Sequence, residues 1–96
     1  MKCANEKLAS LEERHALRLL FHLYNNGRSQ RSSLYNAISK TTTAPMKRVN
    51  ELIELGLVKE IAMESAPFAK NVELTEKGRQ VAKHIVEIDR IFSESN

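Results

Sequence analysis

The sequence predicts a single, mainly α-helical domain over residues 1–96, with a three-helix core, a small β-hairpin and a C-terminal helix. Three observations predict this class. The chain has 96 residues, of which 42% are hydrophobic and 28% are charged, as in an ordinary globular domain. Apolar side chains recur at helical spacing in four separate segments. Between the third and the fourth of these segments, apolar and polar side chains alternate as they do in strands.

The first predicted helix begins at the pattern Ser10-x-x-Glu13, which is typical of a capping box. The stretch "LEERHALRLLFHLYNNG" continues it, and residues 16–24 are apolar except for one arginine and one histidine. A helix with so narrow a polar stripe is expected in the centre of the core. Gly27 is expected just past its end, where a backbone with positive φ is favoured.

The second predicted helix is short and lies within "RSQRSSLYNAISK". Ser32 and Ser33 are both suitable N-caps, and the pattern does not choose between them. Leu34 and Ile38 are four residues apart, so they share the face that we expect to be buried. Residues 39–41 are then left as a short turn into the third helix.

The third predicted helix covers about residues 42–55 and changes character along its length. Thr42 or Thr43 is expected as the N-cap, and Pro45 falls in the first turn, where its missing N–H costs nothing. The sequence then becomes apolar until Gly56, which is expected to end the helix. A polar, basic start and an apolar end predict a helix that is anchored in the core at one end and contacts a partner at the other.

The segments "LVKEIAME" and "KNVELT" predict a two-stranded antiparallel hairpin. Ile61 and Met63 are two residues apart and should share one face of the first strand. Val72 and Leu74 are related in the same way in the second strand. A turn is expected around Pro67.

The last predicted helix covers about residues 75–95, with Thr75 as its N-cap and Gly78 weakening its first turn. Its apolar side chains form a strict seam at Val81, Ile85, Ile88 and Phe92. One reading is that the seam packs on the central helix. A domain this small does not obviously cover both surfaces, so we expect a homodimer through this helix and the N-terminal part of the first helix.

The basic residues are concentrated in the middle of the chain. The net charge is +3, but no Asp or Glu occurs between Arg14 and Asn50. That segment holds seven basic residues, namely Arg14, Arg18, Arg28, Arg31, Lys40, Lys47 and Arg48. The rest of the chain holds eight basic and twelve acidic residues, so the middle carries +7 and the flanks −4. Such segregation is typical of a surface that faces a polyanion.

The second and third helices, joined by a short turn, form a helix-turn-helix arrangement, and the hairpin that follows adds a wing. The stretches "VNELIELGLVKE" (49–60) and "VELTEKGRQVA" (72–82) resemble winged helix-turn-helix regulators of the MarR/ArsR/HxlR type. The residues that carry the resemblance are Leu52, Gly56, Leu57, Val58, Leu74, Thr75 and Gly78. The resemblance covers residues 10–92 and implies a winged-helix fold and a transcriptional regulator that binds double-stranded DNA.

The resemblance also implies roles for individual residues. The third helix should enter the major groove, which admits an α-helix. Its implied groove-facing residues are Thr43, Ala44, Met46, Lys47 and Asn50. Implied phosphate contacts come from Thr42, Arg28, Arg31, Arg48 and, on the wing, Lys70. Fold does not fix function, so a winged-helix module that binds another protein in a larger assembly stays open as the alternative.

The sequence offers no chemistry for catalysis or for a cofactor. A single cysteine, Cys3, excludes an internal disulfide and a four-thiolate zinc site. No phosphate-binding loop or nucleophile motif is present, so we expect no enzyme. His84 and Glu87 form an H-x-x-E pair on the last helix, but they lack further ligands, so we expect no metal. No apolar run approaches a membrane span and no signal peptide is evident, so we expect a cytoplasmic protein.

Overall fold

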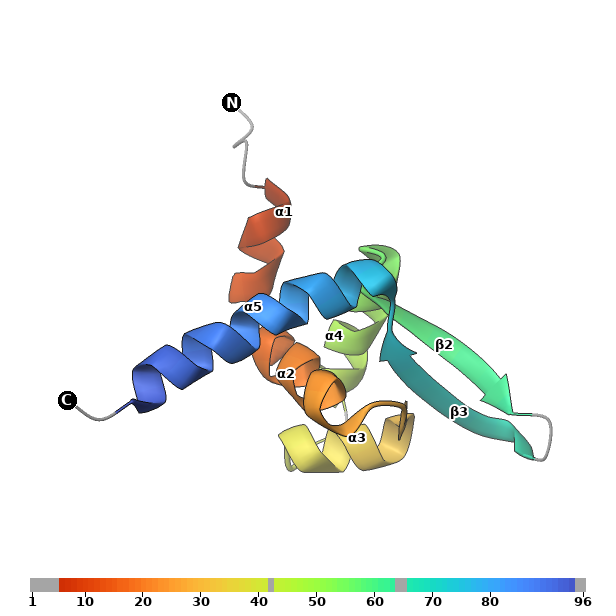
Figure 1. Cartoon of the computed structure of the whole chain (residues 1–96). Coiled ribbons are helices and arrows are strands. Elements are labelled where there is room, and N and C mark those ends of the chain that lie inside the picture. The colour runs from red at the N-terminus through yellow and green to blue at the C-terminus, as the bar shows by residue number, and fades with distance from the viewer. Residues whose placement is uncertain (1–5, 42, 64–65, 95–96) are drawn as a thin grey trace.

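The computed structural model describes residues 6–41, 43–63 and 66–94, and it shows a mainly helical domain with a small sheet at one side (Figure 1). In chain order the elements are α1 (Glu6–Ala9), the 3₁₀ turn η1 (Ser10–Glu12), α2 (Ala16–Asn26), β1 (Ser29–Gln30), α3 (Arg31–Ile38), α4 (Thr43–Glu54), β2 (Val58–Met63), β3 (Ala66–Leu74) and α5 (Glu76–Ser93). The predicted order of helices and hairpin is therefore confirmed.

The helix α2 lies in the middle of the molecule, as its narrow polar stripe predicts. The side chains of Leu19, Leu20 and Leu23 are at most 2% exposed, and α3, α4 and α5 all pack around this helix. Figure 1 shows α5 crossing in front of α2. The complete core consists of Leu19, Leu20, Leu23, Leu34, Tyr35, Ile38, Val49, Leu52, Leu57, Val58, Val72, Leu74, Ala82 and Ile85.

Helical structure is interrupted just before α2, although the sequence predicts a continuous helix from Ser10. Glu13 has an extended backbone, and His15 adopts the left-handed conformation with φ of 72°. The capping box is wrong because the Ser10 hydroxyl donates to a backbone carbonyl of the preceding turn, and the Glu13 carboxylate pairs with Arg48. His15 is the N-cap of α2 in a left-handed conformation, and no glycine in the sequence signals this interruption.

The helix α3 buries Leu34 and Ile38, as predicted. It begins earlier than expected, with Gln30 at the N-cap and no side-chain hydrogen bond there, so the predicted caps Ser32 and Ser33 are wrong. Both serines lie within the helix and are exposed.

The helix α4 matches the predicted range closely. Pro45 lies in its first turn and is buried, and Gly56, two residues past the helix end, has φ of 81°. The N–H of Leu57 then donates to the carbonyl of Leu52 at 3.0 Å, which closes the helix end. Thr42, the other candidate cap, lies outside the described residues.

The sheet is antiparallel with strand order β1-β3-β2, so it has one strand more than predicted. Val58 pairs with Leu74 across the hairpin, and Ser29 of β1 pairs with Val72. The strand β1 was missed because it is only two residues long and has no alternating pattern. The turn predicted around Pro67 is also misplaced, because β3 already begins at Ala66.

The helix α5 starts as predicted, with the Thr75 hydroxyl oxygen accepting from the N–H of Gly78 at 3.0 Å. The same hydroxyl donates to the carbonyl of Gly56 at 2.6 Å, so one side chain joins the ends of α4 and α5. Gly78 does more than weaken the turn. A Cβ there would lie 1.8 Å from the carbonyl oxygen of Leu57, so only glycine allows this close approach.

The hairpin and the C-terminal half of α5 project from opposite sides of the helical bundle (Figure 1). The radius of gyration is accordingly 14.1 Å, compared with about 13 Å for a compact chain of about 100 residues. No helix in the described part of the chain has the length and apolar character needed to cross a membrane.

Candidate nucleic-acid interface

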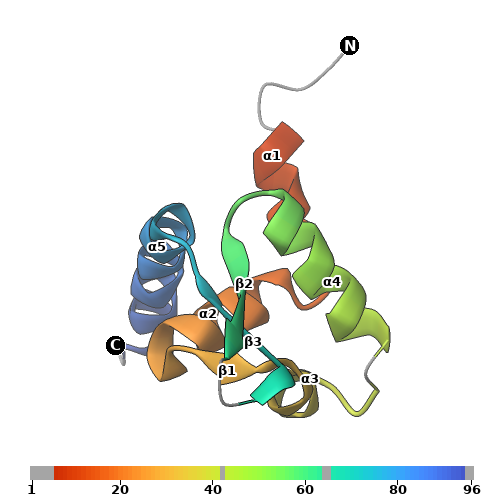
Figure 2. The ribbon, with the colours of Figure 1, turned by 90° about the vertical axis from the view of Figure 1, so that its right-hand side faces the viewer.

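One face of α4 is buried and the other is open. Pro45, Arg48, Val49 and Leu52 form the buried face. The exposed side chains are Thr43, Met46, Lys47 and Asn50, whose spacing of three and four residues places them on one side of the helix, and Ala44 beside them is partly exposed. Figure 2 shows α4 along an outer edge of the molecule. The five residues expected to face a groove are thus brought together on an accessible surface.

Arg48 does not belong to that surface. Its residue is only 9% exposed, and its Nε donates to the backbone carbonyl of Arg14 at 2.9 Å. Its Nη1 lies 2.5 Å from the carboxylate of Glu51 and 3.6 Å from that of Glu13. We expected Arg48 to contact phosphate, but its guanidinium is engaged within the protein. It connects α4 to the segment that precedes α2.

Arg31 is also largely engaged within the protein. Its Nε donates to the hydroxyl of Tyr35 at 2.6 Å, its Nη1 to Glu60 at 2.8 Å and its Nη2 to Asn50 Oδ1 at 2.7 Å. Its side chain is 15% exposed, and its guanidinium lies 5.7 Å from the centre of the Tyr35 ring. Burial disfavours the charge, but the hydrogen bonds to Glu60 and Tyr35 outweigh it, so the pKa of Arg31 is raised and the group stays charged. Arg31 thus joins α3, α4 and β2.

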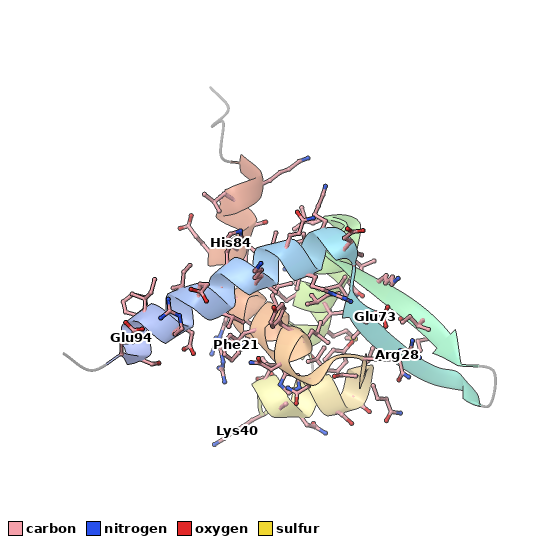
Figure 3. The ribbon with its side chains drawn as sticks, viewed as in Figure 1. Phe21, Arg28, Lys40, Glu73, His84 and Glu94 are labelled. Carbon is pink, nitrogen blue, oxygen red and sulfur yellow. The ribbon has the colours of Figure 1, made fainter. Side chains whose placement is uncertain are left out.

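Arg28 pairs with Glu73 at the base of the hairpin, where both side chains lie together (Figure 3). Its Nε is 3.2 Å from one carboxylate oxygen, and Lys59 Nζ is 3.4 Å from the other. Partial burial works against the carboxylate charge, but these two cations prevail and lower the pKa of Glu73. Because the Arg28 side chain is still 50% exposed, it retains donors for an outside partner.

Three further lysines of the predicted set have no ion pair in the described part of the chain. Lys40, Lys47 and Lys70 are exposed, and no ion pair within residues 6–41, 43–63 and 66–94 involves them. Figure 3 shows Lys40 pointing away from the body of the protein below α3. Three of the seven basic residues of the middle segment, in contrast, pair with acidic residues from outside that segment after folding. These acidic residues lie on α4, β2 and β3 and just after η1, so a count of charges along the sequence does not reveal the pairs.

The apolar seam of α5 divides between the core and the surface. Ile85 is buried and Val81 is partly buried against the core, so both belong to the domain's own packing. Ile88 is 52% exposed and Phe92 is 85% exposed, and Ile91 between them is 60% exposed. A hollow of about 440 Å³ lies beside them, between α2 and α5.

The H-x-x-E pair of His84 and Glu87 lies on α5. Glu87 pairs with Arg90 at 2.9 Å, and no cluster of three metal-ligating side chains occurs among the residues described. His84 is exposed on α5 (Figure 3).

Comparison with known sequences agrees with this architecture. Residues 18–91 match the family described as the ArnR1-like winged-helix domain. No curated protein matches the sequence significantly.

Solved structures share the fold at low sequence identity. A possible HxlR family transcriptional factor from Thermoplasma volcanium is 21% identical with a TM-score of 0.79, and the match covers 97% of this chain and 84% of that one. The transcriptional regulator SlyA is 23% identical with a TM-score of 0.78, over 91% of this chain and 61% of SlyA. A MarR family regulator from Silicibacter pomeroyi is 25% identical with a TM-score of 0.75, over 92% and 60%. The chain therefore spans less than two thirds of the last two regulators.

Proposed function

The chain belongs to the ArnR1-like winged-helix domain family, and we propose that it is a transcriptional regulator that binds specific double-stranded DNA sequences as a homodimer in the cytoplasm. One observation carries the proposal. The exposed face of α4 presents hydrogen-bonding and apolar side chains together with Lys47, for which no ion pair occurs among the described residues, while the opposite face is fixed in the core.

In this proposal the first half of α4 enters the major groove, where each base pair presents a distinct pattern of donors and acceptors. Thr43, Lys47 and Asn50 supply hydrogen-bonding groups, and Met46 and Ala44 supply apolar contact. The buried face of α4 supports the proposal because it holds these groups on a rigid element. Thr42 is kept as a predicted phosphate contact.

In this proposal phosphates are contacted by three cations that lie outside α4. Lys40 precedes the helix, Lys70 lies on the wing strand β3, and the half-exposed Arg28 lies where the sheet meets α3. Contacts of this kind fix the position of a protein on the duplex without reading its sequence. We leave Arg31 and Arg48 out of this set because their guanidinium groups are engaged within the fold.

The homodimer is proposed through the exposed end of α5, where Ile88, Ile91 and Phe92 gather. A contiguous apolar surface on a helix that projects from the domain favours pairing with an equal surface. Two copies related by a two-fold axis would place their recognition helices in successive major grooves, about 34 Å apart.

The proposal is tested by fluorescence-anisotropy titration of a labelled duplex pool with the wild-type protein and with Lys47→Ala. Loss of Lys47 should weaken binding, while Lys83→Ala, which removes an exposed lysine from α5, should not. A wild-type protein that leaves the duplex unbound at low salt contradicts DNA binding and favours a winged-helix module that binds protein. Equal binding by both variants contradicts the assignment of α4 as the recognition helix.

A further inference from the structure

The contact between Arg31 and Asn50 fixes which end of the Asn50 amide faces outward. A guanidinium carries donors only, so it accepts nothing from an amide N–H₂ group. Arg31 Nη2 lies 2.7 Å from Asn50 Oδ1, and this geometry requires the oxygen to be the inner end of the amide. The Nδ2 group, with two N–H donors, is then the end available to a partner.

Arg31 is itself held from two further directions, so it acts as a rigid support. Its Nη1 is paired with Glu60 on β2, and its Nε is bound to the hydroxyl of Tyr35 one turn further along α3. The Tyr35 residue is 7% exposed, which anchors that partner in the core. A planar fork with three fixed contacts has little freedom to leave Asn50.

Asn50 lies on the open face of α4 together with Met46 and Lys47. In a major groove the acceptors on base edges are N7 of both purines, O6 of guanine and O4 of thymine. A donor end fixed toward the groove therefore favours these atoms and disfavours the donor edge of cytosine.

We propose that Arg31 is a positioning residue that holds the Asn50 carboxamide by its oxygen, so that Asn50 reads a purine N7 or another base acceptor at one position of the DNA site. This inference rests on the proposed function of DNA binding. It goes beyond that function because it assigns a base-edge class to one side chain and removes Arg31 from the phosphate contacts.

The experiment selects bound duplexes from a pool with randomised sequence, using the wild-type protein, Asn50→Asp and Arg31→Lys. Asn50→Asp keeps an oxygen for Arg31 but replaces the outward donor by an acceptor. It should reverse the base preference at one position, toward the cytosine N4 donor. Arg31→Lys removes the fork, so the preference at the same position should fall from about fivefold or tenfold toward none.

Matched controls separate this effect from charge and folding. Asn36→Asp places the same new charge on the exposed surface of α3 and should weaken all sequences alike, and Arg79→Lys repeats the arginine change at an exposed position of α5. Thermal melting of each variant checks that the fold is retained, and Asn50→Asp provides the test even where Arg31→Lys is unstable.

The outcomes distinguish the inference from the function on which it rests. A pool that the wild-type protein does not enrich, with no binding at low salt, overturns the proposed function itself. Enrichment by the wild type, with Asn50→Asp and Arg31→Lys weakening every sequence equally, overturns the inference alone. A salt dependence that becomes shallower by about one phosphate in Arg31→Gln, which removes the charge, also overturns it, because Arg31 would then contact the backbone.

Discussion

At the scale of single residues, three residues fix how neighbouring elements are connected or packed together. Gly78 lets the first turn of α5 approach the backbone at Leu57, and Arg48 joins α4 to the segment before α2. His15 turns the chain between η1 and α2 in a left-handed conformation. Each of these roles depends on a contact between segments that are distant in the sequence or on an unusual backbone angle, and each predicts a measurable effect.

Replacing Gly78 by Ala should destabilise the protein by about 2 kcal/mol or more, because the new methyl group meets a backbone oxygen that cannot rotate away. Helix propensity alone predicts the opposite sign, a gain of about 1 kcal/mol. Urea denaturation measures the free energy of unfolding directly. Gln80→Ala, at an exposed position of the same helix, is the control and should change it little. A Gly78→Ala protein more stable than wild type would contradict the close packing of α5 on Leu57.

Replacing Arg48 by Met should lower the free energy of unfolding by about 1–3 kcal/mol, because the carbonyl of Arg14 and the carboxylate of Glu51 lose their donor. The adjacent variant Lys47→Met removes the same charge from an exposed position and should change stability by less than about 0.5 kcal/mol. In denaturation Arg48→Met should lose stability and Lys47→Met should not, whereas in DNA titration Lys47→Met should lose affinity. If Arg48→Met kept full stability and lost only affinity, Arg48 would be a phosphate contact after all.

The pKa of His15 is lowered from its ordinary value of 6.5, first by burial and then by the positive charges of Arg14, Arg18 and Arg48. The unfolded chain therefore binds a proton at a higher pH than the folded chain does. The stability that follows is fully present above pH 6.5 and is lost as pH falls through the lower pKa of the folded state.

The variant His15→Asn tests this dependence, because asparagine tolerates the left-handed backbone and does not titrate. Between neutral pH and about pH 5, the wild type should lose more stability than His15→Asn. Denaturant midpoints at several pH values measure the difference. Parallel curves for the two proteins would show that His15 titrates equally in the folded and unfolded chains.

At the scale of elements, local sequence signals predicted most ends of the helices. They failed where an element depends on contact with a segment that is distant in the sequence. Pro45 and Gly56 gave the third helix its limits, and Thr75 gave the last helix its start. No local pattern marks β1, because its two residues form a strand only by pairing with β3. The spacing of apolar residues in α5 predicted a seam along one side of the helix. Spacing alone does not say which residues of the seam are buried within the domain and which stay exposed.

The exposed part of that seam predicts assembly. Replacing Ile88 by Glu puts a charge into a surface that the proposed dimer buries, which should cost about 2 kcal/mol or more per copy unless the side chain relaxes outward. Light scattering should then show a monomer, and binding to a palindromic site should weaken. Because Ile88 is 52% exposed within one chain, the domain itself should stay folded.

Lys83→Glu is the control for this change, since Lys83 is exposed and lies on a different side of α5 from Ile88. It should remain dimeric. A wild-type protein that sediments as a monomer at high concentration would contradict the dimer and leave a regulator that binds a single half-site.

At the scale of the whole molecule, the distribution of charge after folding differs from the distribution along the sequence. Helical spacing correctly placed Val49 and Leu52 on the buried face of α4. The sequence did not separate cations that stabilise the fold from cations that are free. Arg28, Arg31 and Arg48 meet acids supplied by other elements, and those pairings exist only after folding.

The most direct test of DNA binding through α4 is the salt dependence of the wild-type protein's affinity for duplex DNA. Each neutralised phosphate contributes about −0.9 to the slope of log affinity against log salt. The phosphate contacts proposed for Lys40, Lys70 and the half-exposed Arg28 therefore predict a slope of about −3 per protomer, which the further positive charge of Lys47 in the groove steepens toward about −4. A steep decrease of this size, made shallower by Lys47→Ala, is the expected result. An affinity that does not change with salt would contradict the account.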